Sequence, residues 1–218
     1  NLDGLIIFNK IKGITHFPAN PGLETNIYRS GYTGTSNSNI CNSTRDMCAS
    51  VAIEKMYMHD SDKNNIAHVG HRRWCLNPSM QETGFASDSF YGLMWSCNRS
   101  RKSITKFDYI CYPSKGYFPS THFYSNYVWS ISLNPLLYNV PDIQKVKIQV
   151  FSNKDKFAKE LNITYKNIDT QPIGISNCII FQPENISVTP KSRYHVIISG
   201  LKDLSNKETK VEYYVEFF

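Results

Sequence analysis

Residues 60–78 read DSDKNNIAHVGHRRWCLNP, and no other part of the chain places so many chemically different side chains so close together. Imidazole, guanidinium and indole groups surround a single glycine at its centre. A residue before proline is driven out of the helical region, so Asn77-Pro78 predicts the end of a helix. We therefore expect a short helix over residues 68–76, with His68, His71 and Cys75 along one face.

The same stretch carries a family resemblance. GHRRWCLNP, followed by ETGFA at residues 82–86, is similar to the GHRxxxLNPxxxxxGxG signature of the CAP superfamily, with Ala86 in place of the last glycine. That superfamily includes the cysteine-rich secretory proteins, insect antigen 5 and plant pathogenesis-related proteins. The chain is most similar to its bacterial and protist branch. The resemblance implies a secreted α+β protein, with a CAP-like α/β/α sandwich over residues 1–135 and a small all-β sandwich over residues 142–218.

The resemblance also implies a ligand groove. It maps His16 onto the first histidine of the CAP cavity, where it would face His71 across a shared pocket. Ser38 stands where relatives carry the first glutamate of a His-Glu-His-Glu tetrad, which weakens any catalytic role. The resemblance puts the second glutamate near His59 or Asp60, where Asp60 would be the substitute carboxylate. The predicted groove residues are His16, Ser38, Tyr57, Asp60, His71 and Trp74.

Local patterns predict the remaining elements. An apolar stripe predicts a helix over residues 1–13, although its apolar run would also suit a strand, and a fuller stripe predicts one over 44–59. Residues 18–39 are rich in turn formers and predict a long loop. Aromatic and β-branched runs predict strands at 83–87, 90–97 and 107–113, with 98–106 as a hairpin turn. Further runs predict a strand at 127–135 and a β-sandwich built from 146–151, 157–164, 178–181, 194–199 and 211–217.

Composition limits the function classes. The net charge of +6 is scattered over 218 residues, and no basic run is interleaved with aromatics, so we expect no nucleic-acid partner. No apolar run approaches the ~20 residues that span a bilayer. The chain begins at Asn1 with an apolar pattern under way, which suggests a processed product whose upstream fragment could remain bound.

Cysteines and sequons favour an extracellular location. Six cysteines suit disulfides, with Cys41 and Cys48 close enough to bridge one loop; buried free thiols are the alternative. Four Asn-x-Ser/Thr sequons predict glycosylation at Asn42, Asn98, Asn162 and Asn185.

Three functions remain. The first is a zinc-dependent hydrolase or protease-like site on His16 and His71. The second is a secreted binding module for a peptide, glycan or lipid. The third is a component of an extracellular assembly that contacts a protein partner or itself. The missing glutamate and the lack of an HExxH or GxSxG motif favour a non-catalytic module that binds or assembles.

Overall fold

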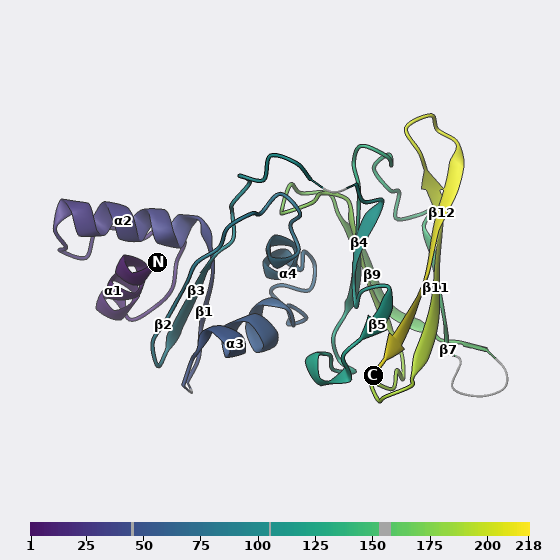
Figure 1. Ribbon diagram of the computed structural model, residues 1–218, viewed down its shortest axis with the longest axis horizontal. Helices are drawn as coiled ribbons and strands as arrows, with labels where there is room; N and C mark the ends of the chain where they lie inside the picture. The colour runs from purple at the N-terminus through teal and green to yellow at the C-terminus, as the bar shows by residue number, and fades with distance from the viewer. Residues whose placement is uncertain (45, 105, 153–157) are drawn as a thin grey trace. The chain divides into compact units, whose positions relative to one another are not determined.

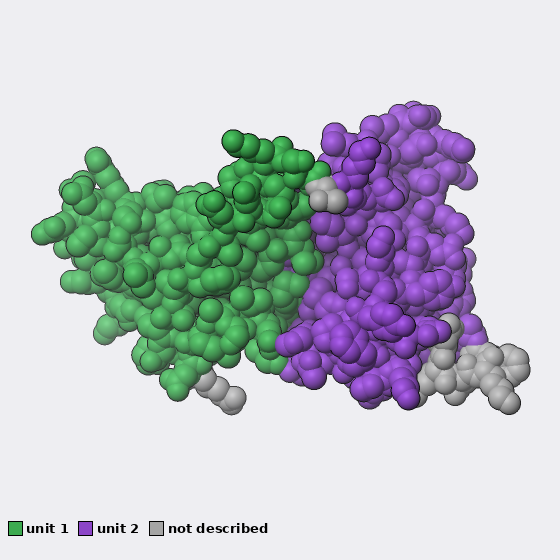
Figure 2. Space-filling model, in the orientation of Figure 1, with its two compact units in different colours: residues 1–59, 74–105 green, residues 60–73, 106–218 purple. Residues whose placement is uncertain are grey.

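The computed structural model describes residues 1–44, 46–104, 106–152 and 158–218 (Figure 1). It contains two compact units, coloured separately in Figure 2. Unit 1 comprises residues 1–59 and 74–105, and unit 2 comprises residues 60–73 and 106–218. Unit 1 contains helices and a sheet and unit 2 contains two sheets, so the predicted α+β class is confirmed.

Unit 1 is a small sheet with helices on both faces (Figure 1). The antiparallel strand order is β1 (Ser38–Asn42), β3 (Tyr91–Trp95) and β2 (Phe85–Ser87). On one face lie α1 (Leu2–Ile11) and α2 (Thr25–Ser36); on the other lie α3 (Ala49–Val51) and the π-helix η1 (Ala52–Tyr57) that continues it.

Side chains that alternate along the strands form a separate core on each face of the sheet. Ile40 and Leu93 are paired across β1 and β3 and pack against α1, whereas their chain neighbours Cys41 and Met94 face η1. Successive strand residues point to opposite faces, so one short sheet supports both helical layers. The helices α1 and α2 pack closely at Gly31, where a Cβ would lie 2.7 Å from the Asp3 carbonyl oxygen.

Three predicted elements of unit 1 can be compared with the helices and strands of the structure. The helix over residues 1–13 is confirmed as α1, which ends at Lys12 in the left-handed region. The predicted loop over 18–39 is wrong, because it contains α2 and the start of β1. The predicted helix over 44–59 starts only at Ala49, after an extended Cys48, and it widens into a π-helix at Ala52. Residue 45 lies outside the described residues.

Unit 2 is a β-sandwich of two sheets. One has the order β4 (Tyr109–Tyr112), β6 (Trp129–Leu133), β10 (Cys178–Pro183) and β9 (Ile163–Asp169). The other has the order β5 (Gly116–Phe118), β12 (Glu208–Phe217), β11 (Arg193–Lys202), β7 (Lys147–Ser152) and β8 (Lys159–Glu160). Only β5 and β12 are parallel among the described pairs. A short 3₁₀ helix, η2 (Ser120–His122), precedes β6.

Aromatic side chains fill the space between these sheets. Trp129 of β6 is fully buried, and its ring lies 5.7 Å from Tyr194 of β11 and 6.1 Å from Phe181 of β10. Phe123 contacts both Trp129 and Phe217 of β12. Aromatic pairs at 4.5–7 Å add to the area they bury, so this cluster is the main core of unit 2.

The division of the chain into units differs from the expected one, which placed the boundary between two domains at residues 135–142. Strands β4 and β6 precede that linker, yet both belong to the same sheet as β9 and β10. The predicted hairpin at 98–106 is wrong for the same reason, since β3 pairs with β1 and β2 whereas β4 pairs with β6. The predicted strands over 127–135 and the C-terminal runs are observed as β6 to β12. The 157–164 prediction begins at a residue outside the described ones.

The expected Cys41–Cys48 bridge is not formed. All six cysteines are described and all are free thiols. Cys41, Cys111 and Cys178 are buried, and Cys48 is exposed. Among the described residues, no helix has both the length and the apolar composition needed to span a membrane.

Candidate functional site

The segment 60–73 belongs to unit 2 and has an unusual backbone. Asp60 and Val69 have positive φ angles, 47° and 42°. Such conformations cost about 1–3 kcal/mol each in residues other than glycine and persist only where the surroundings enforce them. Val69 is fully buried against Val128, Cys178 and Ile180, which holds the turn that precedes α4 (Gly70–Cys75).

Asp60 and His71 form a hydrogen-bonded pair. His71 Nδ1 lies 2.8 Å from Asp60 Oδ1, and the backbone N–H of Arg72 donates to Asp60 Oδ2 at 3.2 Å. The carboxylate is fully buried, whereas the imidazole is 25% exposed. A carboxylate oxygen accepts, so Nδ1 carries the shared hydrogen and the ring orientation is fixed.

Arg72 is buried in the sandwich instead of facing a groove. Its Nη1 donates to the Val128 carbonyl at 2.8 Å and to Ser130 Oγ at 3.2 Å. The guanidinium carbon lies 4.6 Å from the centre of the Tyr112 ring. Burial lowers the pKa of Arg72, while Asp60 opposes that shift. These contacts use the cation to fasten α4 to β4 and β6.

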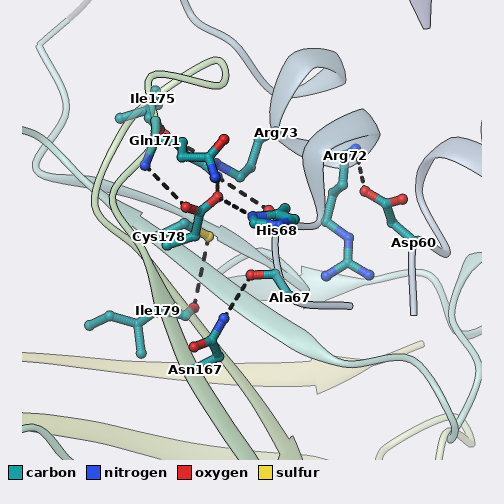
Figure 3. Close-up of polar contacts among 11 residues, drawn as sticks. Asp60, Ala67, His68, Arg72, Arg73, Asn167, Gln171, Ile175, Cys178 and Ile179 are labelled. Carbon is teal, nitrogen blue, oxygen red and sulfur yellow. Dashed lines mark hydrogen bonds and ion pairs between the residues drawn. The ribbon is translucent and has the colours of Figure 1, made fainter. Parts of the chain in front are cut away.

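Arg73 makes the strongest link between the segment and β9 (Figure 3). Its Nη1 lies 2.5 Å from Asp169 Oδ2, with both side chains buried. Nη2 donates to the carbonyls of Gln171 at 2.7 Å and Ile175 at 2.8 Å. Asp169 also contacts His68 Nδ1 at 3.1 Å. Buried charges need this degree of pairing to be tolerated.

Two further bonds tie the same segment to unit 2. Asn167 Nδ2 donates to the Ala67 carbonyl at 2.7 Å, and the Val128 N–H donates to Ser61 Oγ at 3.0 Å. The segment 60–73 is therefore an integral part of the sandwich, although most of the sandwich sequence follows 30 residues later. The predicted common face is wrong at its start, because α4 begins at Gly70 and His68 precedes it.

The predicted groove residues have separate local roles. Asp60 and His71 contact one another in unit 2. In unit 1, Tyr57 is core, with its hydroxyl within 3.1 Å of the Asn39 and Gly92 carbonyls. The Trp74 ring is 5.5 Å from the Arg99 guanidinium.

Ser38 and His16 also have local partners in unit 1. Ser38 Oγ donates to Asn1 Oδ1, and the exposed His16 has Nδ1 3.0 Å from the Thr35 carbonyl. The convergence of His16 and His71 stays a prediction.

The expected metal site requires at least one ligand beside His16 and His71. Within the part of the chain that the structure describes, no three His, Cys, Asp or Glu side chains are grouped to hold a metal ion. His71 with Asp60 supplies one imidazole and its orienting carboxylate, which is part of such a site.

Sequence reasoning missed Asp169, the residue on which Arg73 depends. It lies 96 positions after Arg73, in a region where we expected only packing. The available signal is the position of Asp169: it is the acidic residue that ends the β run ITYKNID. Buried carboxylates almost always have a partner, and the partner here is Arg73.

Comparison with known proteins adds little to this picture. No family model matches the chain, and no curated protein matches it. Among solved structures, PcoC, a copper resistance protein from Escherichia coli, is similar over 50% of this chain and 96% of its own, with 9% sequence identity and a TM-score of 0.32.

Proposed function

We propose that this chain is a secreted, non-catalytic module of the CAP type that functions by binding, and that it assembles with a second copy of itself. Two features support the CAP part of the proposal. Unit 1 has helices on both faces of a small antiparallel sheet, and the GHRRW stretch of the signature forms most of helix α4 (Gly70–Cys75).

The burial of the signature residues supports a non-catalytic role. Asp60, Arg72 and Arg73 are 1%, 0% and 3% exposed, so their charges are used inside the sandwich. A zinc hydrolase built on His16 and His71 remains the alternative function. It requires a third ligand, and the described residues offer no group of three around either ring.

An apolar surface on unit 1 is the observation that carries the binding proposal. Leu2 and Ile6 of α1 and Phe85 of β2 are 72%, 41% and 45% exposed. We call these three residues the α1–β2 surface. Leu2 lines two open hollows of about 340 and 660 Å³; Phe85 lines the smaller one and Ile6 the larger one. Soluble proteins rarely expose grouped large apolar side chains unless a partner covers them.

Charge and edge geometry favour a second copy as that partner. Lys10 and Asp88 line the larger hollow together with Leu2 and Ile6. Partial burial raises the pKa of Asp88, but hydrogen bonds from Phe90, Asn9 and Tyr91 lower it overall, so the carboxylate is negative at neutral pH. A two-fold axis would pair each Lys10 with the other copy's Asp88.

The strand β2 is also an edge of its sheet. An edge strand presents backbone donors and acceptors that a neighbouring chain can use. The apolar contact would supply the affinity, and the Lys10–Asp88 contacts would set the orientation, since exposed ion pairs contribute only about 0–1 kcal/mol.

Sedimentation velocity on matched variants tests this proposal. Ile6→Glu places a charge in the α1–β2 surface, and Leu136→Glu places one at another exposed leucine, which is 77% exposed and in unit 2. We expect Ile6→Glu to shift the protein to monomer at concentrations where the wild type and Leu136→Glu are dimers. Equal behaviour of both variants, or a monomeric wild type, would contradict self-assembly through this surface.

A further inference from the structure

Sulfur is unevenly distributed in this protein. The chain has five methionines and six cysteines. Four of the methionines and two of the cysteines lie in one cluster behind the sheet of unit 1. We call it the sulfur cluster; its members are Cys41, Met47, Met56, Cys75, Met80 and Met94. Methionine often fills gaps in cores, so the geometry inside the cluster decides whether it does more.

Two sulfur atoms in the cluster are already adjacent. Cys75 Sγ lies 3.7 Å from Met94 Sδ. Two sulfur ligands about 2.3 Å from a metal ion are about 3.8 Å apart at a tetrahedral angle and about 4.0 Å apart in a trigonal site. The pair therefore has the spacing of two metal ligands, and a metal ion would need little rearrangement of either side chain.

A polar group orients the Cys75 thiol. Asn39 and Met94 are opposite one another on β1 and β3, and Asn39 Nδ2 donates to Cys75 Sγ at 3.4 Å. The amide is itself fixed, because Ser96 Oγ donates to Asn39 Oδ1 at 3.2 Å. A hydrogen bond to sulfur favours the thiolate, which is the form that binds metal. Such fixed outer partners are typical of metal sites.

The lack of a side chain at Gly92 leaves room for the sulfur atom of Cys41. Gly92 faces Cys41 across the sheet, and a Cβ there would lie 3.0 Å from Cys41 Sγ and 3.4 Å from Met47 Cγ. Burial raises the pKa of Cys41, despite hydrogen bonds with Tyr57 and Gly92 that lower it. Cys41 is therefore a neutral thiol at pH 7, and Cys75 is the thiol that lies beside the Met94 thioether.

The helix that covers the cluster is unusual. Met56 and Tyr57 are in the π-helix η1, and the Tyr57 hydroxyl lies 3.3 Å from Cys41 Sγ. Helices of this type are rare and often occur at functional sites, because the wider turn changes the direction of its side chains. Here the wide turn brings a thioether and a hydroxyl to the same group of sulfur atoms.

We propose that the sulfur cluster binds one copper(I) ion, held by Cys75 Sγ and Met94 Sδ with one of the surrounding thioethers as a third ligand. Thiolate and thioether sulfur are soft ligands that select Cu(I) over zinc or magnesium. The Cys75 proton is released to solvent on binding, and the oxidation state of the copper does not change. The proposed ligands do not include His16, His71 or any residue of the α1–β2 surface.

Anaerobic competition for Cu(I) tests the proposal on the reduced full chain. The metal is supplied as a complex with a chromophoric Cu(I) chelator, and the chelator absorbance reports how much copper the protein removes. We expect one equivalent per chain, and sulfur-only coordination by X-ray absorption. Met94→Leu conserves volume and should lower the affinity by at least about tenfold, and Cys75→Ser should abolish competition.

Two control variants distinguish this site from accidental binding. Cys48→Ser removes the exposed thiol, and Met58→Leu changes the methionine outside the cluster. Both should retain wild-type affinity, and the melting temperature of metal-free Met94→Leu should stay close to that of the wild type. Failure of the wild type to remove copper, unchanged affinity in Met94→Leu, or loss of binding in Cys48→Ser would overturn the proposal.

Discussion

Arg73 and Asp169 are 96 positions apart in the sequence, and their side chains form a buried ion pair of 2.5 Å. The pair joins the segment 60–73 to strand β9, so the most distinctive residues of the chain are structural parts of a β-sandwich. This explains how an Arg-Arg pair beside two histidines is tolerated: each guanidinium has carbonyl, hydroxyl or carboxylate partners of its own.

Removing one member of this pair should strongly destabilise unit 2. Arg73→Met leaves Asp169 buried without its arginine, with contacts to His68 Nδ1 and the Gln171 N–H, and Asp169→Asn removes the carboxylate that pairs with the guanidinium. We expect each to lower the free energy of unfolding by about 3–5 kcal/mol in urea titrations. The double variant should lose less than the sum of the two, whereas additive losses would show that the residues do not interact.

The approach of α1 to α2 should depend on Gly31. A Cβ there would lie 2.6 Å from Ile7 Cδ1 and 2.7 Å from the Asp3 carbonyl oxygen. That oxygen belongs to the backbone of α1, so it cannot move aside as a side chain could. We expect Gly31→Ala to lower the stability of unit 1 by about 1–3 kcal/mol through overpacking. Gly84→Ala is the matched control, because nothing lies within 4 Å of its Cβ position. Thermal melts that fail to separate the two variants would contradict the packing described.

Alkaline pH should weaken unit 2 through Cys111. Burial raises the pKa of this thiol from 9.0 to about 11, against smaller lowering effects of Lys115. The folded state therefore holds the proton more tightly than the unfolded chain. The associated stability is complete below about pH 9 and is lost as the pH rises through about 11, a loss of roughly 2–3 kcal/mol. Unfolding measured at pH 8 and pH 10.5 should show a smaller difference in Cys111→Ala than in the wild type.

Secretion predicts glycans at a subset of the four sequons. Asn42, Asn162 and Asn185 are exposed. Asn98 is half-buried, and its Oδ1 accepts hydrogen bonds from the Gln81 and Ser100 backbone N–H groups. We expect mass spectrometry of chain secreted from eukaryotic cells to find glycans at the three exposed positions and to find Asn98 unmodified. Unmodified Asn42, Asn162 and Asn185 in the secreted chain would contradict the predicted glycosylation.

Strands with alternating apolar and polar residues were predictable, because this alternation is a local feature of each strand. The run 127–135 alternates apolar and polar residues after Val128, and β6 lies there with all five of its residues buried. Helix α2 was not predictable from the same logic. Its residues, TNIYRSGYTGTS, have few apolar side chains, and the helix is held by close contact of Gly31 with α1. Tertiary packing outweighs weak local propensity in such a helix.

The site was only partly predictable for a similar reason. Asp60 and His71 are 11 positions apart, and their pairing follows from a local turn. The distant partners of Arg72 lie in β6 or directly before it, and those of Arg73 lie in β9 or in the loop after it, 56 to 102 positions later. No spacing rule connects residues so far apart. The assignment of β4 and β6 to unit 2 was hidden in the same way, since strand pairing across long separations is set by the assembled core.

The mass of the unmodified chain in solution, measured by light scattering over a dilution series, tests the proposed assembly most directly. The account predicts a particle of twice the 25.1 kDa chain at high concentration that dissociates to one chain on dilution. A mass of one chain at every concentration would contradict it.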